Sequence, residues 1–101
     1  MPWQFYFLEY LGGALLANGV PHFVHGISGD PFPTPFAKPP GVGDSSPVVN
    51  VLWGFANWVA GVLLVHYFWP VNCEGKTLVA VGALAIAWPL AYHFGKVRAR
   101  K

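Results

Sequence analysis

Three of the four histidines in this chain are spaced so that they could hold a cofactor. His22 and His25 are three positions apart, so a helix would present them on nearly the same face. His93 lies near the end of a later apolar segment that would return to the same level. Histidines on facing helices are axial ligands of b-type haem, and these three together with Asp30 could also bind a transition metal. His66 falls near the opposite end of its own segment, too far away to join them.

The interpretation that we favour is that these histidines are polar residues at helix ends. Pro21 and Pro89 lack an N–H, so each frees a backbone carbonyl one turn earlier that a histidine could bond. Kinks at the two prolines could also shape a small pocket lined by His22, His25 and His93. The sequence contains no Ser-His-Asp set, phosphate-binding loop or carboxylate pair, so it indicates no enzymatic activity.

The elements that carry the histidines are long apolar segments. Three stretches without Asp, Glu, Lys or Arg are each long enough to cross a hydrocarbon core about 30 Å thick, which requires roughly 20 helical residues. With 54% hydrophobic and 10% charged residues, a single domain of 101 residues could not hide this much apolar surface from water. We therefore predict an all-α polytopic membrane protein, with transmembrane helices at about 5–26, 48–69 and 77–94.

Basic residues set the predicted orientation. Four of the last six residues are basic, and Lys38 lies in the 28–46 loop on the same side, whereas Lys76 is alone on the other side. This excess predicts an external N-terminus with a cytoplasmic loop and C-terminus, and it speaks against a nucleic-acid partner. Because no basic residue precedes the first apolar segment, we expect that segment to be retained and not cleaved as a signal peptide. The single cysteine, Cys73, excludes an intramolecular disulfide.

The 28–46 loop is rich in proline, with six prolines from Pro31 to Pro47. Because proline fixes φ and removes a donor, we expect an extended, polyproline-like segment. The simplest role is a stiff connector between two helices. The alternatives are a docking surface that exposes Phe32 and Phe36, or two phenylalanine rings that enter the lipid headgroup layer.

Small and polar residues recur along each predicted helix. Helix association in lipid depends on small residues that permit close approach and on polar groups that bond across helices. The predicted packing positions are Gly12 and Gly19 in the first helix, Asn50, Gly54, Asn57 and Gly61 in the second, and Ala80, Ala83 and Ala87 in the third. We expect the two asparagines to bond neighbouring helices. Glu9 lies near the outer surface, where we expect it to form an ion pair with Lys76.

The segments PHFVHG, PFPTPFAKPPG and SSPVVNVLWG, within residues 19–61, resemble a family of short bacterial integral membrane proteins. The resemblance implies a bacterial inner-membrane location and a complete three-span protein, and it brings no activity or site residues with it. The residues themselves favour a non-enzymatic membrane protein without a cofactor that acts by helix association, as a homo-oligomer or as an accessory subunit of a larger membrane complex. One alternative is a protein that binds haem or a metal through His22, His25 and His93. The other is an oligomeric transporter or channel for small solutes, with Glu9 and the two asparagines lining its path.

Overall fold

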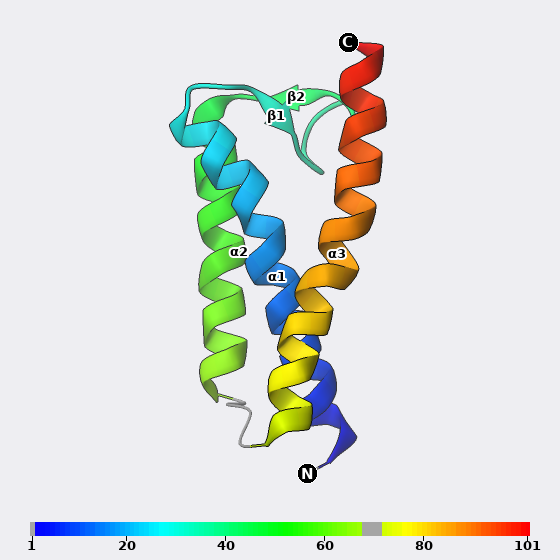
Figure 1. Ribbon diagram of the computed structural model, residues 1–101. Helices are drawn as coiled ribbons and strands as arrows, with labels where there is room; N and C mark the ends of the chain where they lie inside the picture. The colour runs from blue at the N-terminus through cyan, green and yellow to red at the C-terminus, as the bar shows by residue number, and fades with distance from the viewer. Residues whose placement is uncertain (1, 68–71) are drawn as a thin grey trace.

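The chain folds into three long helices and one very small sheet (Figure 1). The computed structural model describes residues 2–67 and 72–101. The predicted all-α class is confirmed, with only two short strands outside the helices. The elements in chain order are α1 (Trp3–Ile27), β1 (Phe32–Pro33), β2 (Asp44–Ser45), α2 (Pro47–Tyr67) and α3 (Cys73–Arg100).

The ends of the helices follow from local sequence signals. Pro47 opens α2, the position where its missing N–H costs nothing. The Asn72 side chain caps α3 by accepting a hydrogen bond of 2.8 Å from the Gly75 N–H. Because of this cap and the basic last turn, α3 extends beyond the predicted bounds 77–94 at both ends. The predicted end of the second helix, at 69, lies outside the described residues.

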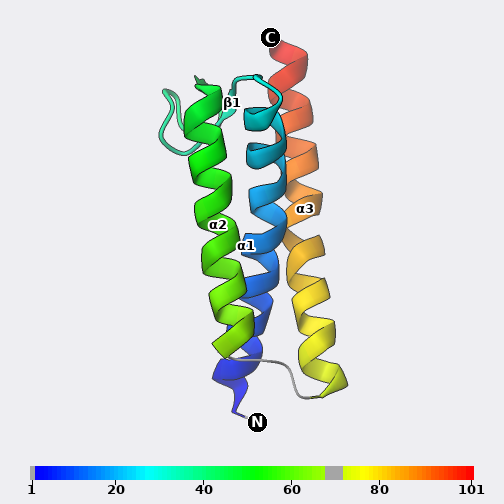
Figure 2. The same ribbon diagram turned by 90° about the vertical axis from the view of Figure 1, so that its left-hand side faces the viewer.

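The middle of the molecule is α1. It packs against α2 on one side and α3 on the other, and in the described part of the chain α2 and α3 make little contact with each other. Figures 1 and 2 show α2 antiparallel to α1, and α3 parallel to it. The N-terminus therefore lies at one end of the helices, and the C-terminus lies at the other end with β1 and β2. The Cα extents are 45 × 23 × 20 Å, so the long axis matches a bilayer of about 40–45 Å including headgroups.

Two of the three helices, α2 and α3, are long and apolar enough to cross a membrane. The prediction of three such helices is therefore only partly met, because α1 does not qualify. The reason is visible in its sequence, which carries Glu9, Asn18, His22 and His25 among its apolar residues. Since α1 packs between the other two helices, most of these polar side chains lie against neighbouring helices or the small sheet.

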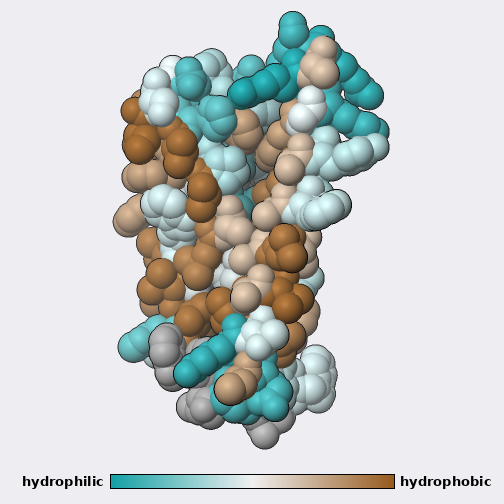
Figure 3. Space-filling view, viewed as in Figure 1, coloured by the Kyte–Doolittle hydropathy of each residue, from teal (hydrophilic) through white to brown (hydrophobic). Residues whose placement is uncertain are grey.

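The burial pattern is the reverse of that in a water-soluble protein. In the described residues, the buried hydrophobic side chains are Phe32, Ala37 and Val97. Polar residues and glycines fill most of the interior, whereas leucine, valine, phenylalanine and tryptophan side chains of α2 and α3 are exposed. Figure 3 shows hydrophobic residues across the middle of the molecule and hydrophilic residues at its two ends. The large apolar surface is thus on the outside.

The proline-rich loop is not the extended polyproline segment that the sequence predicts. It folds back on itself, with β1 antiparallel to β2 and Phe32 paired with Ser45. A turn at Gly41, with φ of 72°, reverses the chain. Phe32 is buried, and only Phe36 is exposed, at 63%. A docking surface built on both phenylalanine rings is therefore excluded. The segment 28–46 forms a folded cap over one end of the helices, which we call the cap.

Candidate functional site

Glycines at seven-residue intervals bring α1 and α2 together. Gly12, Gly19 and Gly26 of α1 are buried, and so are Gly54 and Gly61 of α2. A Cβ on Gly19 would lie 2.7 Å from the Gly54 carbonyl oxygen, and one on Gly61 would lie 3.0 Å from the Gly12 carbonyl oxygen. Only glycine permits backbones to approach this closely. The structure thus places the predicted glycines of these two helices along their shared interface.

Side-chain hydrogen bonds alternate with these glycines. The Asn18 amide donates to the Asn57 Oδ1 over 2.9 Å, and the Asn57 amide donates to the Trp53 carbonyl over 2.8 Å. The Trp58 indole donates to the Leu16 carbonyl over 3.0 Å. Asn57 is buried by these contacts. A solute path lined by the asparagine face of α2 is therefore not formed, because that face is covered by α1.

The contact between α1 and α3 depends on two glycines that the sequence interpretation missed. A Cβ on Gly13 would overlap the Val79 carbonyl, and a Cβ on Gly82 would overlap the Tyr10 carbonyl. The predicted alanine positions of α3 differ from this outcome, because Ala80 and Ala87 are exposed and Ala83 is half-buried. A methyl group is already too large for such a backbone contact. The sequence did contain a signal that was missed. Gly75 and Gly82 are seven residues apart, the same spacing as the packing glycines of α1 and α2.

The predicted ion pair between Glu9 and Lys76 is not formed. Glu9 is 0% exposed, and neither of its carboxylate oxygens has a hydrogen-bond partner among the described residues. Lys76 is exposed at the start of α3. The prediction was wrong because the Glu9 side chain points into the protein. It lies one turn before Gly12, which contacts α2, and Gly13, which contacts α3. Burying a carboxylate without a partner carries a cost in desolvation.

Asn50 ties the cap to α1 and α2. Its amide lies within 3.0–3.2 Å of the carbonyl oxygens of Phe32, Ser45 and Ser46. Its Oδ1 lies 2.9 Å from His22 Nδ1. Because the amide nitrogen is the donor to the carbonyls, Oδ1 must accept, and the His22 Nδ1 must carry the proton. Asn50 is fully buried and thus joins one helix, the neighbouring helix and the loop.

Phe32 is the apolar centre of the cap. The His25 ring stacks on it at 4.2 Å between centroids, with the planes 16° apart. The His22 ring meets Phe32 edge to face with centroids 5.4 Å apart, and the Phe94 ring is tilted at 59° to it with centroids 4.7 Å apart. Aromatic pairs at these separations add to the stabilisation that burial gives. Phe32 therefore links the cap to both α1 and α3.

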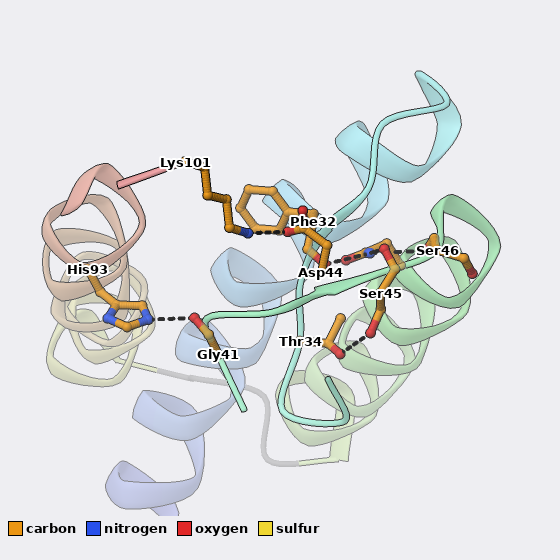
Figure 4. A network of polar contacts seen from close by, with 9 residues as sticks. Phe32, Thr34, Gly41, Asp44, Ser45, Ser46, His93 and Lys101 are labelled. Atoms are coloured by element: carbon orange, nitrogen blue, oxygen red, sulfur yellow. Dashed lines mark hydrogen bonds and ion pairs between the residues drawn. The ribbon is translucent and has the colours of Figure 1, made fainter. Parts of the chain in front are cut away.

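Two further contacts fix the cap to α3, as Figure 4 shows. The His93 Nε2–H donates to the Gly41 carbonyl over 2.7 Å. The Lys101 ammonium donates to the Asp44 carboxylate over 2.6 Å. Within the cap, the hydroxyls of Thr34 and Ser45 are hydrogen-bonded to each other. The end of α3 is thus held by the loop and not by α2.

The three histidines that could have formed a cofactor site have separate partners. His22 bonds Asn50, His25 stacks on Phe32 with Asp30 3.8 Å away, and His93 bonds Gly41. The structure forms no group of three metal-ligating side chains among the described residues. Among the described residues, these histidines do not bond the carbonyls that Pro21 and Pro89 would free. His22 and His93 instead fasten the cap, a role that the sequence interpretation did not anticipate.

A groove of about 540 Å³ opens between the C-terminal halves of α1 and α3. Figure 1 shows the two helices diverging toward this end. Pro21 and His25 line the groove, as expected for a pocket near the proline, but His22 and His93 do not. Its walls are mostly apolar and include Ala17, Val20, Ala87, Ala91 and Phe94, and Arg98 lies at one end of the lining.

The arrangement leaves an open surface at the capped end of the helices. Its polar groups are mostly engaged in structural hydrogen bonds, and its open feature is the apolar groove beside Arg98. Sequence reasoning missed Asn18, Trp58 and Phe94, although an amide or aromatic residue at helical spacing from a predicted seam was a usable signal. Comparison with models of protein families, with curated proteins and with solved structures finds no match to this chain.

Proposed function

We propose that this chain is a non-enzymatic integral membrane protein that works by helix association. It crosses the membrane three times, with the N-terminus outside and the cap and C-terminus in the cytoplasm. Its partner is a second copy or a larger membrane protein to which it is an accessory subunit. The resemblance of residues 19–61 favours a bacterial inner membrane as the location.

The observation that carries the membrane proposal is the reversed burial pattern. Glu9, His22, Asn50 and Asn57 are buried, whereas large apolar side chains such as Trp88, at 76% exposed, are outside. Water would penalise such a surface, and a bilayer would solvate it. Glycine contacts and inter-helix hydrogen bonds are also the interactions that hold helices together when lipid removes the hydrophobic driving force.

The charge distribution supports the orientation. Lys38 and the four basic residues at the end of α3 lie at the capped end, and Lys76 lies at the other end. α1 would be the third span despite its polar residues, because it is sheltered between α2 and α3. A buried polar face does not need to meet lipid.

Association is favoured because α3 is only partly covered. It contacts α1 at Gly82 and meets the cap near its C-terminus. Among the described residues it makes little contact with α2. Cys73 and Ala80 are seven residues apart on one face of α3, and both are exposed. Small residues on a helix surface permit close approach of another helix. We define Cys73 and Ala80 as the open face of α3.

Oxidative cross-linking in native membranes tests this proposal. If two copies meet at the open face, the native Cys73 forms a disulfide-linked dimer, and Ala80→Leu lowers its yield. The matched control is Glu74→Cys combined with Cys73→Ser, because residue 74 is also exposed but lies about 100° around the helix. It should cross-link poorly.

Native mass spectrometry of the detergent-extracted protein separates the two kinds of partner. A homo-oligomer appears as multiples of one chain, and an accessory subunit appears with a different membrane protein. A lone chain that neither cross-links nor co-purifies, at every protein concentration, would overturn the association proposal. Release of the chain from membranes by alkaline carbonate would overturn the membrane proposal itself.

A further inference from the structure

We propose that the groove between α1 and α3 is a binding site for one anionic phospholipid of the cytoplasmic leaflet. The inference rests on the proposed membrane location and orientation, and it adds a ligand that helix association does not require. It is carried by three features of the groove: its lining, its closed inner end and the charge at its mouth.

The lining is suited to an acyl chain. Ala17, Val20, Ala87 and Ala91 form the walls, and the groove holds about 540 Å³. This volume is within the range of about 300–1,000 Å³ for sites that enclose small molecules. The walls contribute methyl groups and short side chains, so a flexible hydrocarbon chain can contact them along its length without opposing any polar group.

The length of the groove matches one leaflet. From Ala87 to Arg98 the lining extends over eleven residue steps of α3, which is about 16 Å along a helix. Half of a hydrocarbon core is about 15 Å. At its inner end the groove closes, because α1 and α3 come into backbone contact at Gly13 and Gly82. A straight transmembrane helix would have to continue past this point, whereas an acyl chain ends at the bilayer midplane.

The charge at the mouth selects the headgroup. Arg98 lines the groove one turn beyond Phe94, and the described residues offer its guanidinium no hydrogen-bond or ion-pair partner. Lys101, by contrast, is already paired with Asp44. A guanidinium presents several donors in a plane and binds phosphate oxygens well. His25 lines the same groove and adds a second polar group on the α1 side.

The test is lipid retention by the full chain. The protein is reconstituted in phosphatidylcholine nanodiscs that contain a minor fraction of phosphatidylglycerol, and the lipids that stay bound are counted by native mass spectrometry. We expect one phosphatidylglycerol per chain, retained in preference to phosphatidylcholine.

Matched variants separate the headgroup from the chain. Arg98→Gln should weaken phosphatidylglycerol retention by at least about fivefold, the effect of one basic residue near an anionic headgroup. Arg100→Gln makes the same change of charge at an exposed position outside the groove, so retention should stay as in the native protein. Ala91→Leu should fill the groove and lower the retention of both lipids. Ala85→Leu, at an exposed position of α3 outside the groove and away from the open face, should not.

Several results would overturn the inference. Equal losses in Arg98→Gln and Arg100→Gln would show only general attraction to a basic tail. Unchanged retention in Ala91→Leu, in a sample whose circular dichroism shows native helicity, would exclude the groove. Dimers that dissociate in Ala91→Leu with no change in bound lipid would assign the groove to a second copy. In each case the proposed function stands if carbonate extraction and cross-linking behave as expected, whereas a chain found outside the membrane would end both proposals.

Discussion

Gly13 of α1 and Gly82 of α3 face each other where the two helices cross, and each leaves room for a carbonyl of the opposite helix. Tyr10 supplies the carbonyl beside Gly82, and Val79 supplies the one beside Gly13. The two contacts are reciprocal, so neither helix can accept a side chain at this level. Among the described residues α2 makes little contact with α3. The position of α3 is therefore determined by this crossing and by the cap.

Gly82→Ala should therefore destabilise the fold. The new Cβ would meet backbone and not a movable side chain, so the helices must separate, at a cost of about 1–3 kcal/mol. The measurement is the free energy of unfolding in detergent micelles, followed by circular dichroism. Gly95→Ala is the control, because a Cβ there has nothing within 4 Å. Equal stability of the two variants would contradict the backbone contact at Gly82.

Gly12→Ala should be milder than Gly82→Ala. Its nearest atom would be a Val65 methyl at 2.9 Å, and the Gly61 carbonyl would remain 3.4 Å away. A side chain can shift where a backbone carbonyl cannot, so we expect a loss below about 1 kcal/mol. The same unfolding measurement gives the ranking. A loss as large as that of Gly82→Ala would contradict this ranking and show that the α1–α2 interface tolerates a methyl group no better than the α1–α3 interface.

The sequence predicts the α1–α2 interface better than the α1–α3 interface, for a physical reason. The seam of glycines and asparagines along α2 is visible because its polar residues have no other use in an apolar helix. On α3 the predicted alanines Ala80, Ala83 and Ala87 form a more conspicuous pattern than Gly75 and Gly82. The face of α3 that packs against α1 is the one where the two backbones can approach closely. An alanine side chain prevents this approach, whereas glycine allows it. The ion pair predicted for Glu9 was wrong for a similar reason. The sequence shows how far along the helix Glu9 lies, but not toward which side of the helix bundle its side chain points.

The cap was the least predictable region. Six prolines indicate an extended chain, yet the segment folds onto the helix ends. Its tertiary contacts are the hydrogen bond from Asn50 to the Phe32 carbonyl and the stacking of Phe32 on His25. Phe32 and Phe36 look equivalent in the sequence, but one is buried and the other exposed. Phe32 is buried because it contacts the rings of His25 and Phe94. These contacts join residues of different elements, so the local sequence around each phenylalanine does not reveal them.

Asn50→Ala should loosen the cap. The change removes the partner of His22 and the donor to the carbonyls of Phe32, Ser45 and Ser46, and leaving buried groups unsatisfied costs about 1–3 kcal/mol. Hydrogen exchange of the 28–46 amides should accelerate, together with a fall in unfolding free energy.

Asn18→Ala is the matched change for Asn50→Ala. It removes one inter-helix bond, to Asn57, so we expect a loss near 0.6 kcal/mol, roughly the average for such bonds in membrane proteins. The cap should keep its protection from exchange. If both variants lose stability equally and leave the loop protected, Asn50 does not hold the cap.

Glu9 and Lys76 should be energetically independent. Lys76→Met should change the unfolding free energy by less than about 0.5 kcal/mol, as is usual for an exposed residue without a partner. Glu9→Gln should leave stability unchanged or raise it, since the buried carboxylate has no described partner to lose. The double variant tests the relationship directly. A coupling energy clearly above zero would restore the ion pair that the structure does not form.

The most direct test of the central claim, three membrane crossings with an external N-terminus, is sided thiol labelling in intact cells and in opened membranes. The native Cys73 is exposed at the start of α3 and reports one end. Gln4→Cys and Lys38→Cys, each in a Cys73→Ser background, report the start of α1 and the cap, and both positions are exposed. An impermeant maleimide should label positions 4 and 73 in intact cells and position 38 only after the membrane is opened. Labelling of positions 4 and 38 from the same side would show that α1 does not cross the membrane, and would contradict the account.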